Sequence, residues 1–285
     1  MPGFTRLYTF HGFHVLCVLS VRPVHNPCLP MFLTDLADAH GYDHVYIAPH
    51  LDDVVLSCGG IVARQRAAAQ RVLVVTVCAG SPPADAPLAP FAVYLHNAWG
   101  LGLDPVAARR YEDKMALERL GADGLHHVSH DAIYRGYTSR MAVFGPPQPD
   151  DPLLPTVTTL LQTLRQLNPQ ALVYLPLAVG GHVDHRVVYN AHGAIRNAGL
   201  AFYEDFPYAA VPNAVSQRLR ELRETFTPST VVFDPYLGRK IGAIAEYASQ
   251  LGELFPVITM ADAVAEYAQK VSGTARHSER LWLLH

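Results

Sequence analysis

Two short segments of the chain hold the side chains best suited to catalysis. Residues 48–53 read Ala-Pro-His-Leu-Asp-Asp, and residues 181–185 read Gly-His-Val-Asp-His. Each segment follows a run of strand type, at 45–47 and 171–175, so each places imidazoles and carboxylates at the carboxyl end of a predicted strand. Open α/β sheets bind their ligands at this edge. Nitrogen and oxygen donors of this kind form hydrolytic zinc sites, which leave one coordination position open for water.

The first segment offers two candidate metal ligands and one spare carboxylate. His50 and Asp53 are three residues apart around a strand-to-helix turn, so both side chains can face one cation. His185, at the end of the other strand, is the candidate third ligand. A set of two histidines and one aspartate suits Zn²⁺, and it also suits Fe²⁺. Asp52 is then free to take a proton from water that the cation activates.

The second segment adds two further candidates. We expect His182 to face the substrate and to donate to the oxyanion of a tetrahedral intermediate. Asp184 is placed to accept a hydrogen bond from an imidazole, which fixes the tautomer of that ring. Taken alone, an Asp-Asp pair before a helix usually caps the helix, and His-x-x-His is usually a surface or core pattern. Their joint occurrence at two strand ends favours a metal site.

Strand and helix patterns alternate along the chain. Continuous apolar strands of this kind predict an α/β, Rossmann-like fold, a single domain over 31–285 with a mostly parallel sheet and helices on both faces. The segments 81–104 and 131–150 are expected to be loops. Strands are predicted at 45–49, 71–78, 125–128, 171–175, 201–203 and 231–233, and helices at 53–69, 105–120, 153–167, 185–197, 218–224 and 239–251.

The composition excludes several classes of protein. Half of the 285 residues are hydrophobic and 16% are charged, which is typical of a chain with a large core. The formal net charge is −3 and no Lys/Arg block occurs, so a nucleic-acid partner is not expected. The four cysteines form no CxxC pair, which favours free thiols in a reducing compartment and a cytoplasmic location.

The first thirty residues differ from the rest. Their apolar stretch at 13–21 is interrupted by His14 and is too short to span a bilayer. Pro23 and Pro27 then interrupt regular structure. We expect residues 1–30 to be a dispensable extension, with a targeting segment as the alternative.

The two segments resemble the signature loops of the PIG-L/LmbE-like zinc-dependent de-N-acetylases. That family has a His-Pro-Asp-Asp-Glu-type loop after the first strand and a later His-x-Asp-His loop, which match 50–54 and 182–185 here. The similarity extends to Arg109-x-x-Glu112 with Leu120-Gly121, to 203–208 and to 279–282, and so covers most of 42–285.

This resemblance implies a Rossmann-like fold that hydrolyses an N-acetyl group, usually on a glucosamine-containing substrate. It implies His50, Asp53 and His185 as the metal ligands. It implies Asp52 as the general base, which later protonates the leaving amine, and His182 as the oxyanion donor.

Within the resemblance, Asp184 supports the oxyanion histidine. Two positions depart from the family pattern. Leu51 replaces the usual proline, which removes one fixed φ angle from the loop, and Val54 replaces the usual glutamate, which removes a carboxylate from the edge of the site. The expected ligands are unaffected, so the departures concern the subgroup and the substrate.

Other polar residues are weaker candidates. Tyr134, Arg135 and Asp205 are expected at the substrate mouth, and capping of local backbone is the alternative for Asp205. Arg109 and Glu112 have the i,i+3 spacing of a pair on a helix surface. The histidines at 126, 127 and 130 are expected at the rim rather than in a second metal site.

Two other functions are compatible with parts of this pattern. A metal-dependent phosphoesterase also uses Asp and His on α/β scaffolds, but such sites hold two metals roughly 3.5–4 Å apart and need bridging carboxylates. A non-catalytic metal- or ligand-binding module is the other alternative, and it has no need of a free carboxylate at Asp52. The expected partner is a small N-acetylated sugar or glycoconjugate, with no stable membrane span and with the oligomeric state left open.

Overall fold

The computed structural model describes residues 30–83, 85–195 and 199–284. The extension expected at 1–30 therefore lies almost wholly outside the described residues and stays a prediction. Among the helices of the described ranges, none combines the length and the apolar character needed to cross a membrane.

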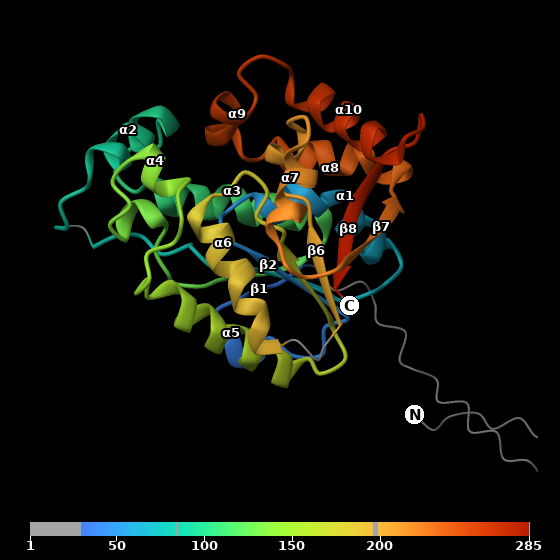
Figure 1. Ribbon diagram of the computed structural model, residues 1–285, viewed down its shortest axis with the longest axis horizontal. Coiled ribbons are helices and arrows are strands. Elements are labelled where there is room, and N and C mark those ends of the chain that lie inside the picture. The colour runs from blue at the N-terminus through green and yellow to red at the C-terminus, as the bar shows by residue number, and fades with distance from the viewer. Residues whose placement is uncertain (1–29, 84, 196–198, 285) are drawn as a thin grey trace, which may run out of the picture.

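A single sheet of eight strands forms the centre of the described chain (Figure 1). Six neighbouring strands, from β1 to β6, pair in parallel, and the pairs β6–β8 and β8–β7 are antiparallel, which confirms the predicted mostly parallel sheet. In spatial order the strands are β1 (Phe32–Leu33), β4 (Asp123–His126), β3 (Val72–Thr76), β2 (His44–Ala48), β5 (Leu172–Pro176), β6 (Leu200–Tyr203), β8 (Ser278–Leu284) and β7 (Phe226–Val232).

The order of the strands reverses direction between β2 and β5. After β2 the chain adds β3 and β4 on one side, and it then returns to place β5 on the other side of β2, with Tyr46 opposite Tyr174. The loops that follow these two neighbouring parallel strands therefore diverge at one edge of the sheet. Such a switch point forms the ligand crevice of open α/β folds.

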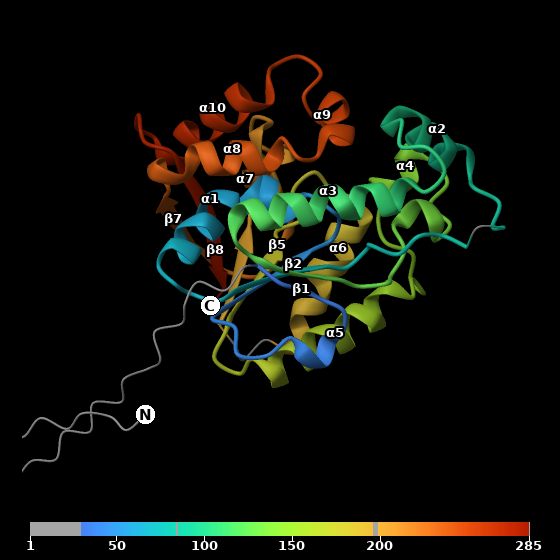
Figure 2. The ribbon, with the colours of Figure 1, turned by 180° about the vertical axis from the view of Figure 1, so that it is seen from behind.

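Helices cover both faces of the sheet, as the sequence predicts (Figure 2). Alternate strand residues serve the two layers: Val45 and Ile47 join the core beneath one set of helices, and Tyr46 and Ala48 join the core beneath the other. One layer contains α5 (Leu153–Leu167) and α6 (Val183–Asn190). The other contains α1 (Asp53–Ala67), α3 (Pro105–Leu120), α8 (Leu237–Ile244) and α10 (Met260–Ser272).

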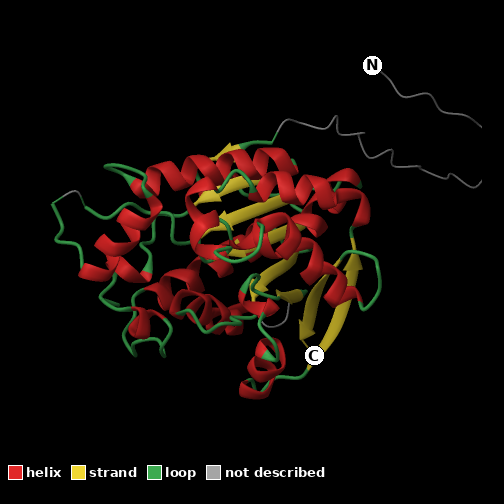
Figure 3. Cartoon of the chain, turned by 90° about the horizontal axis from the view of Figure 1, so that it is seen from above, coloured by secondary structure: helices red, strands yellow, loops and turns green. Residues whose placement is uncertain are grey.

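Shorter elements surround the carboxyl edge of the strands. Seen from above, the sheet runs between the helical layers, and irregular segments gather beyond its strand ends (Figure 3). These segments hold short helices at α2 (Pro90–Trp99), α4 (Arg140–Val143) and α9 (Ala248–Leu254). The remaining helix is α7 (Ala214–Glu221), and 3₁₀ turns occur at Leu36–Asp38, Ala132–Tyr134, Ala191–Ile195, Tyr208–Ala210 and Asp234–Tyr236.

The helix predictions succeed where the ends of a helix carry strong signals. Helices α3 and α5 have the predicted bounds, and Gly121 ends α3 with a φ of 80°. The loop expected over 81–104 is wrong, because it contains α2. That helix begins with Pro90 after Ala89, which has no side chain to cap it, so the usual start signal is missing.

The C-terminal part contains more helices and strands than the sequence predicted. The single helix expected at 239–251 is divided into α8 and α9, and neither α10 nor β8 was predicted. The predicted helix at 185–197 begins earlier, at Val183, and passes into a 3₁₀ turn after Asn190.

Helix α1 is fixed from its side by strand β8. The Glu279 carboxylate accepts the backbone N–H groups of Gly60 and Ile61 at 2.9 and 2.7 Å and pairs with the buried Lys240 ammonium at 2.7 Å. Because α1 begins at Asp53, these contacts link the C-terminal strand to a candidate metal ligand.

Close packing at Gly60 allows a test of this arrangement. A Cβ atom at Gly60 would lie 2.3 Å from Cγ of Phe233. We expect Gly60→Ala to lower the free energy of unfolding by about 1–3 kcal/mol through overpacking, measured by thermal or urea unfolding. Gly252→Ala in α9 is the control, because its Cβ would meet nothing within 4 Å. Equal unfolding midpoints for the two variants would contradict the predicted contact.

Candidate metal centre and catalytic cavity

Both candidate segments open into one cavity at the carboxyl edge of the sheet. Its volume is about 450 Å³, within the roughly 300–1,000 Å³ of sites for small ligands. The polar residues that line it are His50, Asp52, Asp53, Arg109, Asp131, Arg140, His182, His185, Tyr208, Gln250 and Glu253.

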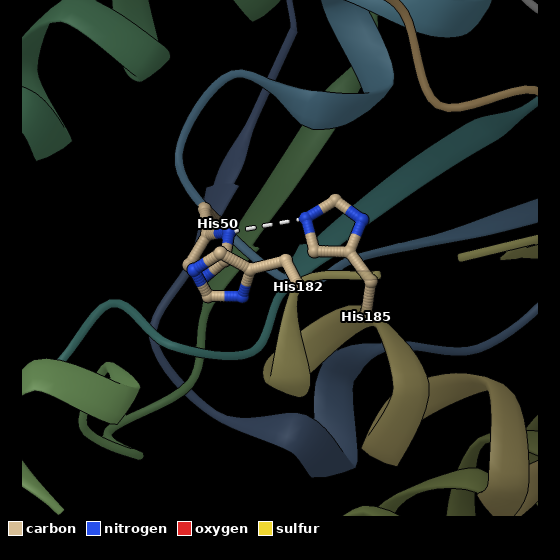
Figure 4. Close-up of side chains that lie close together, drawn as sticks. All are labelled: His50, His182 and His185. Carbon is tan, nitrogen blue, oxygen red and sulfur yellow. Dashed lines mark hydrogen bonds between the residues drawn. The ribbon is translucent and has the colours of Figure 1, made fainter. Parts of the chain in front are cut away.

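The three expected ligands bring one atom each to a common point. Oδ2 of Asp53 lies 3.4 Å from Nδ1 of His50 and 3.3 Å from Nε2 of His185, and the two nitrogens are 3.3 Å apart. Neighbouring ligands of a tetrahedral zinc ion lie roughly 3.4 Å apart, since its bonds are about 2.1 Å long. The donor set therefore fits a single cation. Figure 4 shows two of its members, His50 and His185, together with His182.

Two buried carboxylates determine the tautomers of these imidazoles. Asp184 accepts a hydrogen bond from Nε2 of His50 at 2.9 Å, and Asp205 accepts one from Nδ1 of His185 at 2.7 Å. A carboxylate only accepts, so each outer nitrogen carries its proton. When the rings are neutral, the inner nitrogens therefore turn lone pairs toward Asp53, and a cation between the three atoms would relieve their repulsion.

The surrounding charges favour positive charge at this point. Burial lowers the pKa of His50, but the carboxylates of Asp131, Asp184 and Asp53 together raise it well above its ordinary value. Burial likewise lowers the pKa of His185, and Asp53 and Asp205 outweigh it, so that the net shift is upward. The same carboxylates would stabilise a bound divalent cation.

The adjacent aspartates differ in proton affinity. Burial alone would raise the pKa of Asp53, but the imidazoles of His185 and His50 lower it to about 2. Burial raises the pKa of Asp52 to about 7, with Arg109 opposing the shift and Asp53 adding to it. One carboxylate is thus held ionised beside the imidazoles, and the other is able to exchange a proton near neutral pH.

Asp52 does not act as a simple helix cap. It occupies the N-cap position of α1, but its side chain makes no capping hydrogen bond, so the plainer interpretation of the Asp-Asp pair does not apply here. Its φ of 144° and ψ of −31° are rare for a residue with a side chain, and conformations of this kind cost about 1–3 kcal/mol. Strain of this size is typical of functional sites.

Arg109 holds Asp52 from the side of α3. Its guanidinium donates to Oδ2 of Asp52 at 3.3 Å and to the Leu51 carbonyl at 3.1 Å, and it lies over the ring of Trp99 at 4.8 Å. The expected surface pair of Arg109 with Glu112 is therefore wrong. Glu112 instead accepts two hydrogen bonds from Ser249.

His182 is oriented by the helix that it caps. Its Nδ1 accepts the Asp184 backbone N–H at 3.2 Å at the start of α6. Burial, with the neighbouring His50, lowers the pKa of His182 well below its ordinary value, so the ring is neutral and carries its proton on Nε2. The ring lies 4.6 Å from that of His50, and His50, His182 and His185 also form a possible three-histidine ligand set.

The carboxylate of Asp184 serves a different imidazole from the one expected. It contacts Nε2 of His50, and only the Asp184 backbone reaches His182. Arg135 donates to the other oxygen of Asp184 at 2.7 Å and also pairs with Asp151. The resemblance alone did not indicate this chain of contacts behind the first ligand.

The three weaker candidates do not line the cavity. Arg135 lies between Asp184 and Asp151, and Asp205 is 2% exposed against His185. The Tyr134 hydroxyl is hydrogen-bonded to His96. Two of these residues thus contact the partners or ligands of the centre, which is a position that the sequence did not indicate.

The histidines at 126–130 have partners outside the centre. His126 donates to Asp113 at 2.8 Å, His127 interacts with Ser129, and the His130 carbonyl accepts from Arg135. Among the described residues, the side-chain groups that could hold a metal include none of His126, His127 and His130.

A family model and two curated relatives that match this chain are all named as deacetylases. Residues 45–196 match the model of the PIG-L family, described as GlcNAc-PI de-N-acetylase. The 2'-N-acetylparomamine deacetylase of Streptomyces fradiae is 31% identical over 72% of this chain and 72% of its own. That of Niallia circulans is 31% identical over 74% of this chain and 82% of its own.

Solved structures agree with the observed fold. The zinc-inhibited form of teicoplanin deacetylase Orf2 has a TM-score of 0.74 at 27% identity, over 85% of this chain and 97% of that protein. The A40926 pseudoaglycone deacetylase Dbv21 has a TM-score of 0.72 at 31% identity, with the same coverage.

The contact of Asp205 with His185 generates a measurable expectation. We expect Asp205→Asn to weaken Zn²⁺ binding by about 10–100-fold, the usual effect of losing such a partner, measured by competition with a chelator. Asp234→Asn is the control, because its carboxylate pairs with Arg276 and does not line the cavity. Equal zinc affinity in the two variants would show that Asp205 does not support the centre.

Proposed function

Because this chain belongs to the PIG-L family of de-N-acetylases, we propose that it is a metal-dependent hydrolase that removes the N-acetyl group from an amino sugar or its conjugate. The observation that carries the proposal is the convergence of three acceptor atoms beside a separate carboxylate in one cavity. Relatives named as deacetylases of 2'-N-acetylparomamine and of teicoplanin support a sugar-type substrate.

The residues proposed to hold the cation are His50, Asp53 and His185. Their nitrogen and oxygen donors favour Zn²⁺, with Fe²⁺ as the alternative. When bound, the cation would polarise the scissile carbonyl and lower the pKa of a water molecule toward about 7.

Asp52 is the proposed general base. It lines the cavity but is not one of the three converging ligands, so its carboxylate remains available for a proton. It would accept a proton from the attacking water and later give it to the nitrogen of the leaving amine, which completes the cleavage of the C–N bond. Arg109 would keep this carboxylate oriented during both transfers.

His182 is the proposed oxyanion donor. Its Nε2–H is free of protein partners among the hydrogen bonds of the described residues, and the ring lines the cavity. The negative charge that develops on the former carbonyl oxygen would accept a hydrogen bond from this group. Asp184 fixes the orientation of His182 through its backbone N–H.

Release of acetate tests the proposed reaction and the proposed base together. We expect the zinc-loaded protein to release acetate from glycosides of N-acetylglucosamine. Asp52→Asn should retain Zn²⁺ but lose about 10²–10⁴-fold in kcat, since the amide cannot accept the proton. Turnover and metal content are measured on the same samples. If Asp52→Asn kept full activity, another group would be the base.

Loss of the imidazole at His182 should affect the transition state more than substrate binding. We expect His182→Ala to lower kcat by about 10²–10³-fold, the usual effect of removing one oxyanion donor, with a smaller change in KM. Metal content should remain near one equivalent. A variant that lost the metal instead would favour the three-histidine ligand set.

A further inference from the structure

The cavity has two chemically different parts. Its floor carries the imidazoles and carboxylates of the centre, and its remaining wall is mostly apolar and aromatic. Building on the proposed function, we propose that the N-acetylated sugar carries an uncharged apolar group, its aglycone, which this wall binds. The substrate would then be a glycoside or glycoconjugate with an apolar aglycone.

Helix α2 supplies one side of this wall. Phe91, Leu95 and Trp99 are four residues apart, so they form one stripe on the helix, and all three line the cavity. They are half-buried, so they retain apolar surface that a ligand can cover. A helix that only completed the core would bury this stripe fully.

Other segments complete the wall from different directions. Phe144 follows α4, Tyr208 follows β6, and Leu254 ends α9; each lines the same cavity. The Phe144 and Tyr208 rings meet edge to face with centroids 6.0 Å apart. Aromatic rings in such arrangements offer large, rigid apolar surface to a bound group.

One apolar residue of the lining is open to solvent. Val211 lines the cavity and is 59% exposed. It therefore offers apolar area that a bound apolar group can cover.

The charged residues of the cavity do not by themselves select the aglycone. The lining holds the carboxylates of Asp52, Asp53, Asp131 and Glu253 and the guanidinium groups of Arg109 and Arg140. Arg109 is paired with Asp52, and Asp53 faces the imidazole of His185. The inference therefore depends on the apolar wall and not on the charge of the lining.

The test compares glycosides that share the sugar and differ in the aglycone. We expect the phenyl and octyl glycosides of N-acetylglucosamine to exceed the methyl glycoside in kcat/KM by on the order of tenfold or more, mainly through KM. A mono-N-acetylated aminoglycoside, which has no apolar aglycone, should not exceed the methyl glycoside. Preference for phenyl over octyl, or the reverse, would identify an aromatic or an alkyl aglycone.

Alanine variants test whether the preference for an apolar aglycone depends on the wall residues. Phe91→Ala should reduce the ratio of phenyl to methyl kcat/KM by about fivefold or more. Tyr111→Ala is the matched control, because this aromatic residue of α3 is 65% exposed and does not line the cavity. It should leave the ratio and the basal activity unchanged.

The outcomes separate this inference from the proposed function. Equal kcat/KM for methyl, phenyl and octyl glycosides, or preference for the aminoglycoside, would overturn the apolar aglycone and leave deacetylation intact. Absence of acetate release from every substrate would instead overturn the proposed function. An unchanged ratio in Phe91→Ala would also contradict the assigned wall.

Discussion

Three polar atoms that face one point impose the constraint on which the site depends. The inner nitrogens of His50 and His185 and an oxygen of Asp53 lie 3.3–3.4 Å apart. Asp184 and Asp205 accept hydrogen bonds from the outer N–H groups of the two rings, so the inner nitrogens are the ones that can bind a cation. A cation is the natural partner of such a set, and the fold maintains the geometry by placing its segments after two adjacent strands, β2 and β5.

The same constraint explains why so much charge is buried behind the centre. Arg135 neutralises Asp184, and Asp151 in turn pairs with Arg135, so the carboxylate that orients His50 is held from behind. Burying unpaired charge would be costly, whereas a paired chain of this kind keeps a ligand oriented at small cost. On the other side of the site, Arg109 does the same for Asp52. The centre is therefore stabilised by ion pairs that extend away from the cavity.

The sequence predicted the parts of the site that depend on residue type and on strand ends. His50, Asp53 and His185 could be selected because each is a metal-ligand type at the carboxyl end of a predicted strand. Arg109 could not, because its spacing from Glu112 resembles an ordinary surface pair and only the tertiary structure turns it toward Asp52. Arg135 and Asp205 were expected at the substrate mouth, but they contact Asp184 and His185 instead. Nothing in the sequence near either residue indicates these partners. Helix α2 was missed because it lacks a capping side chain.

The difference between the features that the sequence predicted and those that it did not has a physical origin. A metal centre tolerates only a few tenths of an ångström in ligand position, so it needs specific residue types on rigid strand ends, and that requirement is visible in a sequence. An apolar wall needs only enough exposed apolar area in the right place, and Phe91, Phe144 or Leu254 can supply it from a helix, a loop or a helix end alike. Many unrelated patterns satisfy the second requirement. The class of reaction was therefore predictable from the two signature segments, whereas the substrate preference that we propose depends on how α2, α4 and α9 come together around the cavity.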